Sequence, residues 1–264
     1  IRRTGAMKGK TVSQRVDKLE SHILYNGTVR LDFDPQRHRY KINGEFAYGV
    51  TTALSVIAKP QLIWWAATMA SDHFKENVVP GEPLDELQIQ ELCDGARKAH
   101  NQKKDKAADA GTYIHNYIES FVLGENPARP VNESLNRVID DFMEWWNKTN
   151  IEVIAPEQVF CSPTLGLAGT ADLVCKVDGK LTIMDWKTGS GIYPEMFLQL
   201  AAYALMWEEE HPDQPIEQLY VVNASVKNMF QTMVRDEVKF FENGYRQALD
   251  LYKTTKKMEN IFKS

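Results

Sequence analysis

The chain has 264 residues, of which 43% are hydrophobic and 25% are charged, and its net charge is −5. This is enough apolar sequence for one large core, and the charged fraction is ordinary for a soluble globular protein. No run of about 18 apolar residues occurs, so we expect no membrane-spanning helix and no membrane partner.

The first half of the chain is predicted to be mainly helical. We expect residues 1–37 to form an N-terminal extension that is partly disordered. Asn43-Gly44 predicts a hairpin with a two-residue turn. Thr51 or Thr52 can cap a short helix that ends before Pro60. Further helices are predicted over residues 61–77, 84–104, 106–123 and 133–147, with Trp64 and Trp65 mostly in the core.

From residue 151 the pattern changes to strands. The predicted order is a strand, a hairpin, a helix that begins with proline, two strands and a final helix, over residues 151–162, 168–188, 194–210, 216–225, 230–238 and 241–262. We therefore expect a single domain, 1–264, in which a hairpin and helical region over 38–150 precedes a core over 151–264.

The hairpin over residues 168–188 carries the most informative residues of the chain. Asp178-Gly179 is a strong two-residue turn signal, and it would place Asp172 directly opposite Asp185, with Cβ atoms about 4.5–5.5 Å apart. Lys187 lies on the same face as Asp185, because side chains along a strand alternate. A turn one residue longer or shorter would shift this register.

Two acids and a lysine that converge on one point are typical of a site that holds Mg²⁺ or Mn²⁺ and handles a phosphate. Two carboxylates placed opposite each other destabilise a hairpin unless positive charge lies between them. The alternative is that Asp172 and Asp185 are strand-end residues in solvent.

Other polar residues are candidates for the same site. His115 could be a further metal ligand on a helix face that it shares with Thr112, although a lone histidine on a helix is more often structural or solvated. Glu157 could orient a metal-bound water, or it could be a solvent-facing strand residue. Gln199 and Tyr203 stand four apart on one helix face, where they could touch a phosphate or a base, or form an ordinary surface pair.

Basic residues cluster in two places, which matters because an acidic protein can still bind DNA through local positive charge. We expect the cluster before His115 to contact phosphates; a solvated helix face is the alternative for both clusters. The first comprises Arg97, Lys98, Lys103, Lys104 and Lys106, and the second comprises Lys253, Lys256, Lys257 and Lys263.

The ordered set of His115, Glu157, Gly169-Thr-Ala-Asp172, Asp185-Trp-Lys187 and Gln199-x-x-x-Tyr203 resembles the RecB-like branch of the PD-(D/E)XK nuclease superfamily. It is most similar to phage-type exonucleases and to the mitochondrial genome maintenance exonuclease group. The resemblance covers roughly residues 38–225. Alanine, where many relatives have proline, precedes Asp172, and no cysteine follows Cys175, so the four-cysteine iron–sulfur cluster of some relatives is not expected.

The resemblance implies an α/β fold, with a restriction-endonuclease-like mixed β-sheet core flanked by helices and a helical N-terminal half. It implies a Mg²⁺- or Mn²⁺-dependent DNA exonuclease that acts in recombination, repair or processing, in the cytoplasm of a bacterial or phage-infected cell. The implied metal ligands are His115, Asp172, Asp185 and the main-chain carbonyl of Trp186. Lys187 would lie near the attacking water, and Gln199 and Tyr203 would line the DNA path.

Two other functional classes stay open. One is a non-catalytic nuclease-fold module that binds DNA or a partner protein, which a degraded acid–lysine set would favour. The other is a metal-free hydrolase that uses the two aspartates as acid and base. Lys187 and the Gln199–Tyr203 pair argue against the second class.

Overall fold

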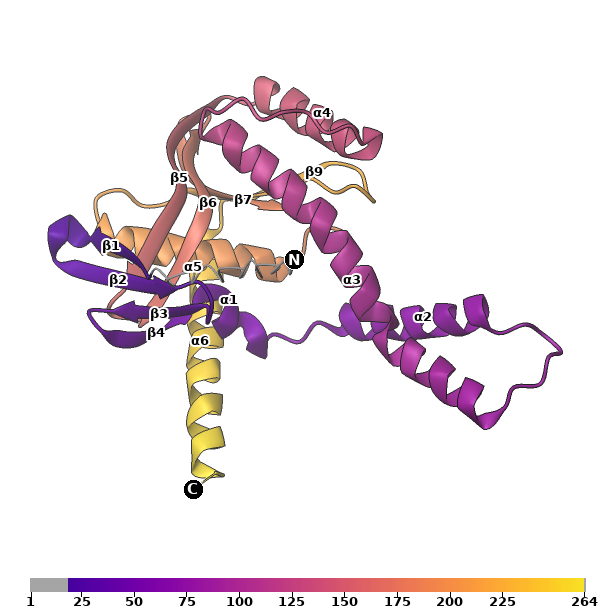
Figure 1. The fold of residues 1–264 in the computed structure, drawn as a ribbon. Coiled ribbons are helices and arrows are strands. Elements are labelled where there is room, and N and C mark those ends of the chain that lie inside the picture. Colours follow the sequence, from indigo (N-terminus) through magenta and orange to yellow (C-terminus); the bar gives the residue numbers. More distant parts are fainter. Residues whose placement is uncertain (1–18, 264) are drawn as a thin grey trace, which may run out of the picture.

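The computed structural model describes residues 19–263, without the side chains of residues 102–108. Its strands form one mixed nine-stranded sheet in the order β1-β2-β3-β4-β6-β7-β8-β9, with β5 paired to β6, and helices cover the sheet (Figure 1). This confirms the predicted α/β class. No helix in the described range has an apolar stretch long enough to cross a bilayer.

Antiparallel strands at the N-terminal edge of the sheet occupy residues 20–24 and 29–34, where no strand was predicted. β1 (Glu20–Leu24) and β2 (Val29–Asp34) precede β3 (Arg39–Ile42) and β4 (Glu45–Gly49). The missed signal is the alternation in β2, where Val29 and Leu31 are buried. The predicted turn between β3 and β4 is confirmed, because Asn43 and Gly44 have φ values of 50° and 87°.

The helices after β4 differ from the prediction in two ways. The first helix is only α1 (Val50–Ala53), followed by the 3-10 turn η2 (Leu54–Val56), and its N-cap residue makes no side-chain cap. The two helices expected over 84–123 are one continuous helix, α3 (Glu86–Val122). A capping box starts α3, and residues 104–106 contain neither glycine nor proline that would end it.

α2 (Pro60–Asn77) and the first half of α3 form an arm that projects from the body of the protein (Figure 1). α2 begins with its proline at the first helical position and contains no buried residue. Trp65 is half-buried, but Trp64 is 76% exposed, so the expectation of two core tryptophans was wrong for Trp64. Helical periodicity shows which residues share a face but does not show what covers that face.

The central hairpin is formed by β6 (Leu167–Val177) and β7 (Lys180–Lys187). The predicted register is confirmed at Val174–Ile183 and Leu173–Met184, and the turn residues Asp178 and Gly179 have φ values of 50° and 84°. All four paired side chains are fully buried. The hairpin is therefore covered on both faces, as its continuous apolar sequence predicts.

Different helices cover the two faces of this hairpin. α5 (Pro194–Glu210) and α6 (Val238–Ile261) pack on the face of Val174. The last turns of α3, together with α4 (Glu133–Lys148), pack on the face of Leu173. The remaining strands are β5 (Ile151–Ser162), β8 (Gln218–Asn223) and β9 (Gln231–Arg235).

The sheet splits beside β6, and this split determines where the polar residues lie. One edge of β6 is paired with β5 along almost its whole length. On the other edge, β4 pairs only with Leu167 and Ala168, and β7 pairs only from Leu173 onward. In the pairing of the described strands, residues 169–172 therefore have no ladder partner on that side, and Asp172 lies in the opening.

The packing of α4 generates a stability prediction. Phe142 is fully buried and its ring contacts those of Phe121, Trp146 and Trp186. Phe142→Ala should lower the free energy of unfolding by about 3–5 kcal/mol, because it removes apolar burial and leaves a cavity. The matched change Phe240→Ala, at a ring that is 73% exposed, should cost about 0.5 kcal/mol or less. Urea unfolding measures both, and equal losses would contradict this account of the core.

Candidate active site

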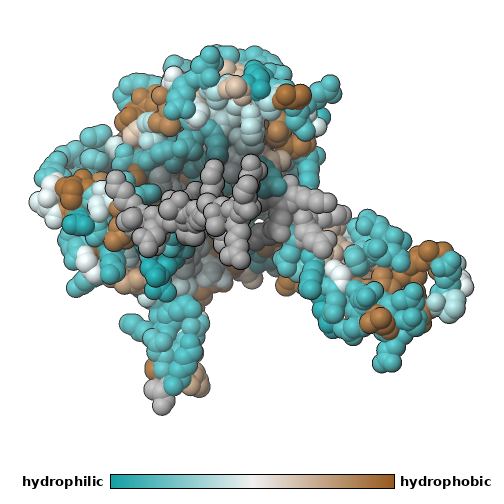
Figure 2. All heavy atoms as spheres, in the orientation of Figure 1, coloured by the Kyte–Doolittle hydropathy of each residue, from teal (hydrophilic) through white to brown (hydrophobic). Residues whose placement is uncertain are grey.

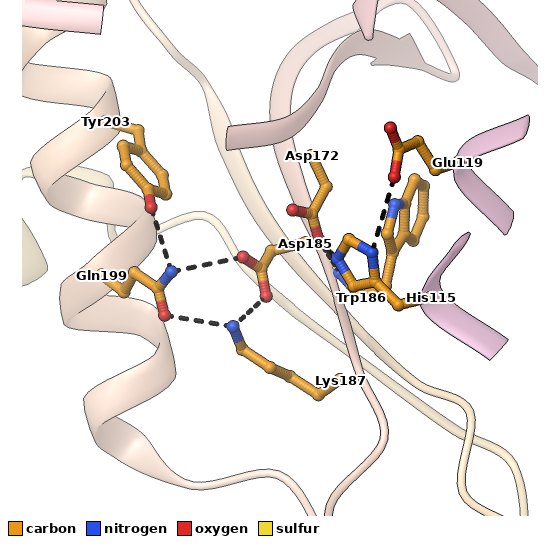
Figure 3. A network of polar contacts seen from close by, with 8 residues as sticks. All are labelled: His115, Glu119, Asp172, Asp185, Trp186, Lys187, Gln199 and Tyr203. Carbon is orange, nitrogen blue, oxygen red and sulfur yellow. Dashed lines mark hydrogen bonds and ion pairs between the residues drawn. The ribbon is translucent and has the colours of Figure 1, made fainter. Parts of the chain in front are cut away.

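Asp172 and Asp185 lie where β6 and β7 separate (Figure 3). The ladder between these strands ends at Leu173 and Met184, one pair before the expected pairing of the two aspartates. The reason is a hydrogen bond of 2.7 Å in which the backbone N–H of Trp186 donates to Oδ2 of Asp172. A side-chain carboxylate thus takes a strand N–H, and β7 turns away from β6.

Asp185 and Lys187 form a buried ion pair. Nζ of Lys187 lies 2.5 Å from Oδ2 of Asp185, whose side chain is only 3% exposed. Burial, and then the charge of Asp172, raise the pKa of Asp185. Burial alone would lower the pKa of Lys187, but the two neighbouring carboxylates outweigh it and raise that pKa. The ammonium group therefore stays charged at neutral pH.

Gln199 and Tyr203 on α5 complete one side of the site (Figure 3). Gln199 accepts from Lys187 Nζ at 3.1 Å and donates from Nε2 toward Asp185 at 3.4 Å and toward the Tyr203 hydroxyl at 3.0 Å. The proposed pair does lie beside the acids. Tyr203, however, is only 3% exposed, so it can hold Gln199 but has little surface to offer DNA.

His115 reaches the other side of the site from α3. Its Nε2 lies 3.5 Å from Oδ2 of Asp172, and its Nδ1 lies 3.9 Å from Oε2 of Glu119. The hydrogen bond to Asp172 is the main cause that raises the pKa of His115, against the effect of burial. Glu119 was not among the candidates from the sequence, although a carboxylate four residues after a histidine on a helix lies on the same helix face.

Glu157 lies on β5 in an unusual backbone conformation. Its φ of 46° is in the left-handed region, which non-glycine residues seldom adopt. Its neighbours Pro156 and Gln158 pair with Leu173 and Ala171, so the register places Glu157 opposite Asp172. Burial, followed by the charge of Asp172, raises the pKa of Glu157 to about 7.

Two carboxylate oxygens of this group lack a hydrogen bond. Oε1 of Glu157 and Oδ2 of Asp185 are buried without a hydrogen-bond donor of regular geometry, although the ion pair with Lys187 reaches the second. Buried oxygens of this kind are the hard donors that Mg²⁺ and Mn²⁺ prefer. Among the residues that the structure describes, no three His, Cys, Asp or Glu side chains form a ready-made metal cage.

The remaining candidates are not joined to this network. Thr112 is exposed on α3, one turn before His115. The side chains of Lys103, Lys104 and Lys106 lie outside the described residues. In the second basic cluster, Lys253 donates to the carbonyl of Leu165 and Lys256 pairs with Glu259.

Two contacts that the sequence did not indicate fix the segment after Lys187. A Cβ atom on Gly111 would lie 2.5 Å from Oγ1 of Thr188, so α3 approaches this segment closely. Asn223, which is fully buried and paired in register with Lys187, donates to the carbonyl of Gly189 at 3.3 Å. α3 and β8 therefore both hold the backbone that carries Lys187.

Comparison with known proteins gives a match to one family and distant likenesses to solved structures. The model of the PD-(D/E)XK nuclease superfamily matches residues 131–262, half of the chain. No curated protein matches the sequence. An alkaline exonuclease from Laribacter hongkongensis is 12% identical, with a TM-score of 0.27 over 76% of this chain and 99% of its own. The protein SSO0001 is 11% identical, with a TM-score of 0.26 over 72% and 86%. Structural similarity with TM-scores this low does not support an inference about the function of this chain.

The contact at Gly111 can be tested by adding one methyl group. Gly111→Ala should lower the free energy of unfolding by about 1–3 kcal/mol, because the new Cβ overlaps Thr188. At an unobstructed helix position, the same change stabilises a protein. Adding Thr188→Ala removes the hydroxyl and should restore most of the loss in urea unfolding. A double variant no better than Gly111→Ala alone would argue against this contact.

Proposed function

The chain belongs to the PD-(D/E)XK nuclease superfamily, and we propose that it is a metal-dependent DNA exonuclease of the RecB-like branch. The mixed sheet flanked by helices is consistent with the restriction-endonuclease-like core of that superfamily. The matched range includes Asp172, Asp185, Lys187, Gln199 and Tyr203. Superfamily membership supports nuclease chemistry, and the geometry of these residues supports a complete catalytic set.

The observation that carries the proposal is the buried pair of Asp185 and Lys187 beside Asp172. A carboxylate at 3% exposure with an ammonium group at 2.5 Å is costly to bury unless it serves a purpose. A non-catalytic module would have no reason to keep this set intact. We therefore favour an enzyme over a DNA-binding or partner-binding module.

We propose that His115, Asp172, Asp185 and the main-chain carbonyl of Trp186 hold Mg²⁺ or Mn²⁺. Support comes from the carboxylate oxygen of Asp185 that lacks a regular hydrogen bond, and from the short distance between His115 and Asp172. A divalent ion at this position would supply Lewis acidity toward a phosphoryl oxygen and a water molecule. No role is assigned to an iron–sulfur cluster.

The side chains of the chain itself would do the remaining work. Lys187 places a positive charge where a phosphate gains negative charge during hydrolysis, and Gln199 holds its ammonium group in position. Glu157, with a pKa of about 7, is suited to accept a proton from an attacking water at neutral pH. We propose that Thr112, Gln199, Lys103, Lys104 and Lys106 contact DNA, and that Tyr203 acts through Gln199.

The biological setting follows from this activity. An enzyme that removes nucleotides from DNA ends serves recombination, repair or processing, and we expect it in the cytoplasm of a bacterial or phage-infected cell. The three cysteines are free thiols in the structure, which is compatible with that setting.

Substitution of Lys187 tests the activity. Lys187→Ala should lower the rate of DNA cleavage by about 100-fold to 1,000-fold, as expected for loss of one group that stabilises the transition state. Asp185→Asn should have a similar effect. Lys180→Ala, at the other end of the same strand, is the matched control and should retain the parental rate.

The assay follows end-labelled linear DNA and circular DNA with Mg²⁺, Mn²⁺ or EDTA. An exonuclease spares the circle, and near-parental cleavage by Lys187→Ala would place the chemistry elsewhere.

Thermal melts with and without Mn²⁺ test the metal ligands. A ligand that binds only the folded state stabilises it by about 2.7 kcal/mol at 100 times its dissociation constant. The parent should therefore melt at higher temperature with Mn²⁺, and Asp172→Asn should lose most of that shift relative to its own metal-free melt. Asp178→Asn changes an exposed carboxylate at the turn of the same hairpin and should keep the full shift. Equal shifts in all three proteins would count against this site.

A further inference from the structure

Three consecutive apolar residues are exposed at the start of α2. Leu62 is 53% exposed, Ile63 is 74% exposed and Trp64 is 76% exposed. The other tryptophans of the chain are buried or half-buried. A run of three exposed apolar side chains is unfavourable in a free protein unless it binds something. Figure 2 shows hydrophobic side chains among hydrophilic ones on the arm to which this segment belongs.

The start of α2 is linked to the elements that carry the active site. Nζ of Lys59 lies 3.6 Å from Oε1 of Glu195, which is in the first turn of α5, one turn before Gln199. The ring of Trp65 packs edge-on against His100 at 6.3 Å, which joins α2 to α3. α3 then continues to His115. The start of α2 is therefore linked on one side of the run to α5 and on the other side to α3.

Charge along the arm indicates what the run can bind. Residues 60–71 contain no charged side chain, and Lys98 stands near His100 on the adjoining part of α3, whereas Arg97 is paired with Asp94 at 3.0 Å. The far end of the arm is acidic, because seven carboxylates and a single lysine lie there: Asp72, Lys75, Glu76, Glu82, Asp85, Glu86, Glu91 and Asp94. A polyanion is therefore repelled from the far end of the arm and meets no carboxylate along residues 60–71.

We infer that Trp64, at the end of this exposed run, forms a stacking platform for the unpaired bases of a DNA strand whose end enters the active site. This inference rests on the proposed nuclease function and deepens it, because it makes single-stranded DNA the form that is engaged. Bases have flat apolar faces that stack on aromatic side chains regardless of sequence, while nearby cations follow the phosphates. A protein partner with an apolar surface is the competing occupant.

The test measures binding of a fluorescently labelled single-stranded oligodeoxynucleotide by anisotropy, in EDTA so that no cleavage occurs. Trp64→Ala should weaken binding by about fivefold to 100-fold, the range expected for loss of one base–aromatic stack. Trp64→Phe keeps an aromatic ring and should retain most of the affinity. Leu87→Ala, at an apolar residue that is 68% exposed on the acidic end of the arm, is the matched control and should bind like the parent. Because these side chains are largely exposed, all three variants should fold, which thermal melts verify.

A second oligonucleotide of the same length, with abasic sites in place of its bases, separates stacking from charge. The parent should bind it more weakly than the ordinary strand, and Trp64→Ala should bind it as the parent does. The inference is overturned if Trp64→Ala binds the ordinary strand as tightly as the parent, which would leave a protein partner as the occupant. It is also overturned if the substitution weakens both oligonucleotides equally. A parent that cleaves DNA in Mg²⁺ while Trp64→Ala shows no binding defect refutes the platform alone, whereas a parent that neither binds nor cleaves any DNA refutes the nuclease function as well.

Discussion

A carboxylate with 3% of its side chain exposed can stay ionised only where its surroundings supply positive charge and hydrogen-bond donors, and Asp185 depends on both. Lys187 supplies the charge, and Gln199 orients the ammonium group while donating toward the other carboxylate oxygen. Removal of one partner from a buried ion pair of this kind costs about 3–5 kcal/mol, because an uncompensated charge is left behind. Gln199 and its partner Tyr203 are both on α5. The packing of α5 against the sheet therefore helps to keep Asp185 and Lys187 ionised, because it holds Gln199 within hydrogen-bond distance of both.

The opening in the sheet is the second requirement of the site. If β7 paired with β6 along its full length, the N–H of Trp186 would belong to the ladder and Asp172 would be a side chain on a closed surface. Instead, the carboxylate of Asp172 takes that N–H, β4 occupies only the first two residues of the free edge, and the ring of Tyr203 packs over Gly169. A Cβ on Gly169 would lie 3.0 Å from that ring, so the glycine is what lets α5 approach the opening.

Local signals made part of this arrangement predictable. Asp178-Gly179 and Asn43-Gly44 adopt the left-handed turns that their sequences favour, and the first of these turns fixed the register that brings Asp172 toward Asp185. Features that depend on contacts between residues far apart in the chain could not be predicted from local sequence in this way. The left-handed φ of Glu157 and the contact of Gly111 with Thr188 arise only once strands and helices meet. Trp64 illustrates the same limit, because amphipathic spacing is identical for a helix in a core and for a helix on a projecting arm.

The continuity of α3 has a mechanical consequence. A helix of 37 residues is about 55 Å long, and this one reaches from the arm to His115 without a break. Gly111 rests on Thr188 one turn before His115, and the turns that follow are buried against the sheet through Ile114 and Ile118. The imidazole that faces Asp172 is therefore positioned by a continuous helix that is anchored on both sides of it, and no loop intervenes between the arm and the carboxylates.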